Sequence, residues 1–152
     1  MVGSELEELA LSADKYPPKL IKRSRVGESS NNIDKHPDFI KIEKLAFEKF
    51  GLAAMSHRHG VFGMQHPLPP IVKYGLTFLF VQSEFGLCCP LRLTDFLTRT
   101  LKKFGDKKLI AKFFDQLTSQ DLDHLFQGAM FMTELHAGSD VGSIDTLAEF
   151  EN

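Results

Sequence analysis

The stretch MFMTELHAGSDVGS, residues 130–143, joins an apolar run to a polar turn that contains glycine. The run, GAMFMTE from Gly128 to Glu134, is too short and too apolar for another surface helix, and Gly128 would weaken one. We therefore predict a β-strand here, the first in the chain. A lone strand cannot satisfy its own backbone donors and acceptors. We expect the fold to be incomplete at this point.

The chemistry of this segment suits a polar ligand that carries a flat ring. Backbone groups of Met130, Met132 and Thr133 would lie along the strand, and the Thr133 hydroxyl can donate or accept a hydrogen bond. Gly138 permits close approach of the backbone, and the N–H groups around Gly138 and Ser139 could hold a phosphate. A cofactor with a planar heteroaromatic head and a pyrophosphate tail would fit. An ordinary strand followed by a Gly-Ser-Asp turn is the alternative that the residues leave open.

The residues before this segment predict a helical unit. Pro37 opens a helix in which Phe39, Ile42 and Ala46 recur at helical spacing, and Gly51 closes it. Residues 71–85 are apolar on nearly every side, which predicts a central, buried helix, with a strand over TFLFV as the alternative. Helices are expected over 3–13, 37–50, 71–85, 91–104, 106–114 and 119–126.

Finer expectations concern faces, caps and loops. The helix over 91–104 should present one apolar face, and Thr118 with Asp121 has the form of a capping box that opens the last helix. Residues 24–34 have almost no apolar anchor and predict an exposed loop, as do residues 56–70. The apolar face comprises Leu93, Phe96, Leu97, Leu101 and Phe104.

Composition and charge narrow the classes of function. The chain has 152 residues, the size of one domain, and a net charge of −2, so nucleic-acid and membrane-surface binding are not expected. The basic cluster Lys19, Lys22, Arg23 and Arg25 is expected to be solvated. No apolar run approaches the roughly 20 residues that span a bilayer, and the N-terminus does not resemble a signal peptide.

The cysteines and histidines predict no metal site. Cys88 and Cys89 are adjacent and cannot form an ordinary framework disulfide, so a reducing, cytoplasmic setting with both thiols buried is expected. His57 and His59 are two apart in a loop without further ligands at suitable spacing. His136, inside the 130–143 stretch, is expected to be exposed.

Residues 130–142, MFMTELHAGSDVG, resemble the flavin-contacting motif of acyl-CoA dehydrogenases. Phe131 stands where a small residue is usual, and Leu135-His136 replace the more typical pair. Residues 36–58, 80–95 and 102–121 also resemble this family, and especially the branch that includes the bacterial alkylation-response flavoprotein. The positions that satisfy the motif are Met132, Thr133, Glu134, Ala137, Gly138, Ser139, Asp140 and Ser143.

The resemblance implies a mainly α fold: the N-terminal helical domain of an acyl-CoA dehydrogenase over 1–126, and the first strand of its middle β-domain over 127–152. FAD would be the cofactor, with Met130, Met132 and Thr133 against the isoalloxazine ring and Gly138 in the turn that follows. Ser139 would reach the pyrophosphate or the pantetheine of an acyl-CoA substrate.

The same resemblance implies an oxidoreductase that is a homo-oligomer when intact. The catalytic carboxylate of the family belongs to its C-terminal domain, so no catalytic residue is assigned here, and we expect this chain alone to be inactive. Glu134 is expected to have a structural role at the turn. The alternative is a helical interaction module that derives from the same family and has lost catalysis.

Overall fold

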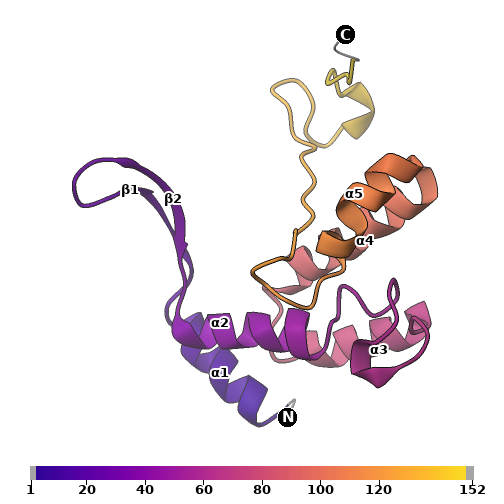
Figure 1. Ribbon diagram of the computed structural model, residues 1–152. Helices are drawn as coiled ribbons and strands as arrows, with labels where there is room; N and C mark the ends of the chain where they lie inside the picture. Colours follow the sequence, from indigo (N-terminus) through magenta and orange to yellow (C-terminus); the bar gives the residue numbers. More distant parts are fainter. Residues whose placement is uncertain (1–2, 150–152) are drawn as a thin grey trace.

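The computed structural model describes residues 3–149, and its architecture is mainly helical (Figure 1). Within these residues the main regular elements are five α-helices and one two-stranded antiparallel sheet, which confirms the predicted fold class. A π-helical segment, Lys44–Lys49, continues α2 without a break. The elements are α1 Glu5–Asp14, β1 Lys19–Arg23, β2 Ser29–Asp34, α2 Pro37–Glu43, α3 Pro70–Val81, α4 Cys88–Phe104 and α5 Lys107–Leu117, with 3-10 turns at Val61–Gly63 and Val141–Ser143.

The hydrophobic core lies where α1, α2 and the turns after α2 meet the ends of α3 and α4. Pro37 begins α2, as predicted, and Gly51 follows the π-helical segment with a φ of +54°, a conformation that favours glycine. A β-carbon at Gly51 would also lie 2.9 Å from Val61, so the close packing excludes larger residues. The largest fully buried apolar side chains are Leu6, Ile42, Phe47, Met55, Val61 and Leu87.

The helix predicted over 71–85 forms as α3, which excludes the strand alternative, but it is not central. Ile71 is 79% exposed and Phe78 is 64% exposed. Lys73, Thr77 and Phe80 are its buried residues, because α3 lies at the side of the molecule and meets the rest along one face (Figure 1).

The predicted apolar face of the helix over 91–104 is also not the buried one. In α4 the residues that pack inward are Leu91, Thr94, Asp95 and Thr98, whereas Leu97 and Phe104 are exposed. The helix begins at Cys88, where Cys88 is half-buried and Cys89 is exposed, so the expectation of two buried thiols was wrong for Cys89.

The polar stretch expected to be a loop over 24–34 contains a strand instead. β2 pairs antiparallel with β1, with Leu20 opposite Ile33, and only residues 24–28 form the turn. The sequence showed no alternation of apolar and polar residues there, because this hairpin does not rest on a core.

Two further predictions were wrong. Thr118 ends α5 rather than opening a helix, because its hydroxyl donates back to the Phe114 carbonyl, and residues 119–126 form turns. Residues 128–134 form no strand: nothing within residues 3–149 pairs with them, and a ladder needs a partner. In the part of the chain that the structure describes, no helix is long and apolar enough to cross a membrane.

Candidate functional site

The predicted ligand-binding segment leaves the helical unit at Gly128, which is fixed against α4. The Gly128 amide donates to the Thr94 hydroxyl over 3.0 Å, and that hydroxyl donates to the Pro90 carbonyl over 2.7 Å. A β-carbon at residue 128 would lie 2.5 Å from the carbonyl oxygen of Leu93. Only glycine therefore lets the chain approach α4 this closely.

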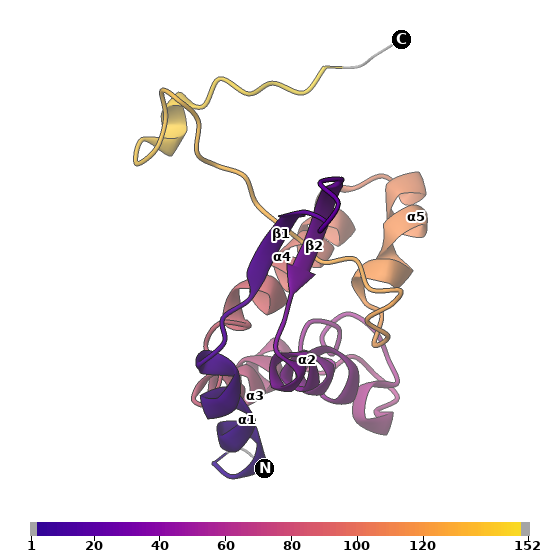
Figure 2. The same cartoon turned by 90° about the vertical axis from the view of Figure 1, so that its left-hand side faces the viewer.

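Beyond Gly128 the chain runs away from the helices (Figures 1 and 2), and residues 129–133 are exposed. Met130 is 56% exposed and Met132 is 41% exposed, and the Thr133 side chain is exposed as well. Within residues 3–149, no hydrogen bond engages the backbone groups of 130–133 or the Thr133 hydroxyl. These groups are available to a ligand.

A closed turn follows, and Glu134 holds it. The Glu134 amide donates to the Ala137 carbonyl over 2.8 Å, and its carboxylate accepts from the amides of Asp145 and Thr146. The hydrogen bond from the Thr146 hydroxyl, together with the Asp145 amide, keeps the pKa of Glu134 below its ordinary value. The structural role predicted for Glu134 is confirmed.

This turn brings the two halves of the predicted site together. The bond between Glu134 and Ala137 places Thr133 on one side of the turn and Gly138 on the other. Gly138 has open space where a β-carbon would be, and Ser139 is exposed. All five predicted residues thus lie on one exposed segment, and none is inside a helix. His136 is exposed, as expected.

The sequence analysis missed a buried charged cluster that fixes α4, and hence the anchor of this segment. Asp95 is 0% exposed; its Oδ1 accepts from Nε2 of His57 over 2.7 Å, and its Oδ2 forms an ion pair with Nζ of Lys73. Arg99, one turn along α4, approaches Oδ1 at 3.5 Å. Through these contacts Asp95 joins the turn after α2, α3 and α4.

The cluster is held by charge despite its burial. Burial by itself would raise the pKa of Asp95, but the hydrogen bond from His57 and the ammonium group of Lys73 outweigh it and lower that pKa to about 2. Burial lowers the pKa of Lys73, and Asp95 partly opposes this. Asp95 is therefore ionised at neutral pH, and it neutralises a buried cation.

The sequence contained a signal for this cluster. Leu91, Thr94, Asp95 and Thr98 recur at helical spacing, so an acid lies within a stripe that also carries an apolar residue and small hydroxyls. The sequence around His57 points only to a candidate metal ligand, not to an acidic partner on α4. Within residues 3–149 no group of three or more histidine, cysteine or acidic side chains could hold a metal ion.

Comparison with known proteins agrees with this fold. The family model for the adaptive response protein AidB N-terminal domain matches residues 1–124. The chain is 27% identical over 151 residues to acyl-CoA dehydrogenase family member 11 of Caenorhabditis elegans, covering 97% of this chain and 24% of that protein.

Two solved structures share the fold. The structure of Caenorhabditis elegans ACDH-11 in complex with C11-CoA superposes with a TM-score of 0.73 at 25% identity, covering 93% of this chain and 24% of that one. The apo form of Bd2924 gives a TM-score of 0.75 at 24% identity, covering 93% and 27%. The chain spans about a quarter of the length of each relative. It belongs to the AidB N-terminal domain family and corresponds to the N-terminal part of an acyl-CoA dehydrogenase family protein.

Proposed function

We propose that this chain is the N-terminal portion of an FAD-dependent oxidoreductase that dehydrogenates the CH–CH bond of acyl-CoA thioesters. Residues 1–126 form its helical domain, and residues 127–152 begin its middle β-domain. Residues 1, 2 and 150–152 of these ranges lie outside the described part of the structure. The family membership and the likeness to a protein solved with C11-CoA support the proposal.

One observation carries the assignment of the site. The segment from Met130 to Thr133 is fixed at its base by Gly128, yet it leaves its backbone groups and the Thr133 hydroxyl without partners among residues 3–149. Polar groups that a fold leaves unpaired at a defined position are ready to meet a ligand or another domain. The exposed Met130 and Met132 add an apolar surface beside them.

These residues fit FAD. Met130 and Met132 would lie against the isoalloxazine ring, and the Thr133 hydroxyl would hydrogen-bond its polar edge. Gly138 leaves room for close approach, and the N–H groups beside it, with the Ser139 hydroxyl, would hold the pyrophosphate or the pantetheine of the substrate. When bound, FAD supplies the acceptor for the electrons that leave the acyl chain.

The proposal also explains why the predicted strand has no partner strand within residues 3–149. In a middle β-domain, residues 129–133 would gain the neighbouring strand that they lack within residues 3–149. The intact protein is then proposed to be a homo-oligomer, with acyl-CoA as its substrate.

The test is to express the complete reading frame that contains these 152 residues and to analyse the purified protein. We expect a yellow protein that releases FAD on denaturation and loses its visible flavin absorbance when acyl-CoA is added without an electron acceptor. A well-folded, colourless protein with no extractable flavin would contradict the proposal. That outcome would favour a non-catalytic interaction module, for which the exposed β1–β2 hairpin is the supporting observation.

A further inference from the structure

The β1–β2 hairpin projects from the helical unit as an arm (Figures 1 and 2). Every apolar residue between Lys19 and Asp34 is exposed, and Val26 at the tip is 81% exposed. A two-stranded hairpin without a packed face is at best marginally stable in water. The exposed apolar residues of this arm are Leu20, Ile21, Val26 and Ile33. The arm would gain stability from a surface that covers them.

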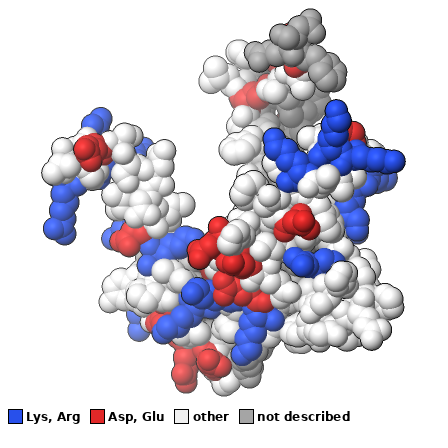
Figure 3. Space-filling model, in the orientation of Figure 1, with Lys and Arg blue, Asp and Glu red and all other residues white. Residues whose placement is uncertain are grey.

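The arm is also basic. Leu20 lies opposite Ile33 in the ladder, and the exposed Lys22 lies where the register shifts between Ile21 and Arg23. Within residues 3–149, neither Lys22 nor Arg25 has an ion-pair partner. Residues 19–34 carry four basic side chains against two acidic ones, Glu28 and Asp34. The arm therefore combines aliphatic side chains with an excess of positive charge, and Figure 3 shows both signs over it.

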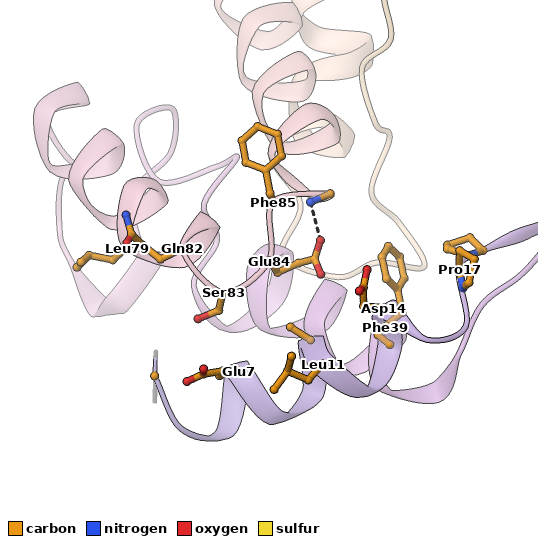
Figure 4. Close-up of a pocket in the computed structure, with 15 residues that line it drawn as sticks. Glu7, Leu11, Asp14, Pro17, Phe39, Leu79, Gln82, Ser83, Glu84 and Phe85 are labelled. Atoms are coloured by element: carbon orange, nitrogen blue, oxygen red, sulfur yellow. Dashed lines mark hydrogen bonds between the residues drawn. The ribbon is translucent and has the colours of Figure 1, made fainter.

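A cleft of about 750 Å³ has the complementary character. It lies between α1 and the connection from α3 to α4, with Leu11 on one side and Leu79 and Phe85 on the other (Figure 4). Its charged lining residues are Glu7, Asp14 and Glu84, and no lysine or arginine of the described chain lines it.

The acidic lining decides which kind of ligand the cleft can take. Glu84 accepts from the Gly86 amide over 2.6 Å, but Glu7 and Asp14 have no ion-pair partner within residues 3–149. Three carboxylates repel the phosphates of a nucleotide or of coenzyme A. An apolar cleft with an acidic lining instead fits a basic segment that carries aliphatic side chains.

We propose that this cleft binds the β1–β2 hairpin of a second copy of this chain. Pro17 and Pro18 line the cleft and also lead into β1, and the arm extends from them away from its own cleft. Because arm and cleft are contiguous but point apart, a two-fold axis lets each copy place its arm in the cleft of the other. Such reciprocal contacts close at the dimer. The inference does not depend on flavin binding.

The test measures the oligomeric state of the 152-residue chain by analytical ultracentrifugation over a range of concentrations. We expect a monomer–dimer equilibrium that weakens as salt is raised, because opposite charges meet at the interface. Lys22→Glu in the arm and Glu7→Lys in the cleft are each expected to raise the dimer dissociation constant more than about tenfold, since like charges would then meet. Lys108→Glu is the control: it makes the same change of charge on α5, at a residue that is neither in the arm nor in the lining of the cleft, and should leave the dissociation constant unchanged.

A mixture of the two variants makes the test specific. In the mixed dimer, the glutamate introduced into one chain's arm meets the lysine introduced into the other chain's cleft. The second contact of that dimer is native, so association should return. A wild-type chain that stays monomeric at every concentration would overturn the proposal. The arm would then have to be covered by another domain or by a different protein. Dimers that persist in both single variants, or no recovery in the mixture, would also overturn it.

Discussion

The amide of Gly128 donates to the Thr94 hydroxyl of α4 at a point where a β-carbon would meet the Leu93 carbonyl oxygen at 2.5 Å. This contact joins the helical unit to the segment that carries the proposed flavin-binding residues. The buried Asp95 lies next to Thr94 on the same helix. The position of the segment therefore depends on the packing of α4.

Gly128→Ala tests this contact. The added methyl group must push the backbone of 128 away from α4, which we expect to destabilise the attachment by about 1–3 kcal/mol. Chemical denaturation gives the change in free energy of unfolding, and hydrogen exchange at the amide of residue 128, which the Thr94 hydroxyl protects, should become faster. Gly75→Ala is the control, because Gly75 lies on an exposed position of α3 with nothing within 4 Å of its β-carbon. Equal stability of the two variants would contradict the role of Gly128.

Asp95→Asn is expected to lower the free energy of unfolding by about 3–5 kcal/mol, because it leaves the buried Lys73 ammonium uncompensated. Adding Lys73→Met to that variant should recover part of the loss, since the double replacement removes the buried cation as well. Asp115→Asn on the exposed side of α5 should change stability by less than about 0.5 kcal/mol. A single variant as stable as wild type would show that the cluster contributes little.

The same cluster predicts a dependence of stability on pH. The folded-state pKa of Asp95 is about 2, below the value of about 3.9 for an unfolded chain. The contribution of Asp95 is therefore fully present above pH of about 4 and is lost as pH falls towards 2. Urea denaturation across this range should show a steeper loss for wild type than for the Asp95→Asn, Lys73→Met double variant. Parallel pH profiles would contradict the assignment.

The helices were predictable from local patterns, whereas the features set by tertiary contact were not. Pro37 and Gly51 mark the ends of one helical run because proline and glycine have backbone preferences that need no neighbours. The arm was missed because its strands bury no face, so Leu20 and Ile33 leave no periodic signal. Asp95 and Lys73 were missed because their partnership depends on how α3 packs against α4.

The candidate site was found by a different route. The order of residues from Met130 to Ser143 resembles a known motif, and this resemblance located the segment although the predicted strand does not form within residues 3–149. The residues alone left an ordinary turn as the simpler interpretation. What the sequence could not supply was the anchor, since the need for glycine at 128 arises from the approach to Leu93 of α4.

The central claim is that the exposed segment around Thr133 binds the flavin. Its most direct test is to measure FAD affinity and the visible flavin spectrum of Thr133→Val in the protein expressed from the complete reading frame. Loss of one hydrogen bond predicts an affinity lower by about 3–10-fold, with an altered spectrum and unchanged helical content. An affinity and a spectrum identical to wild type would contradict the assignment.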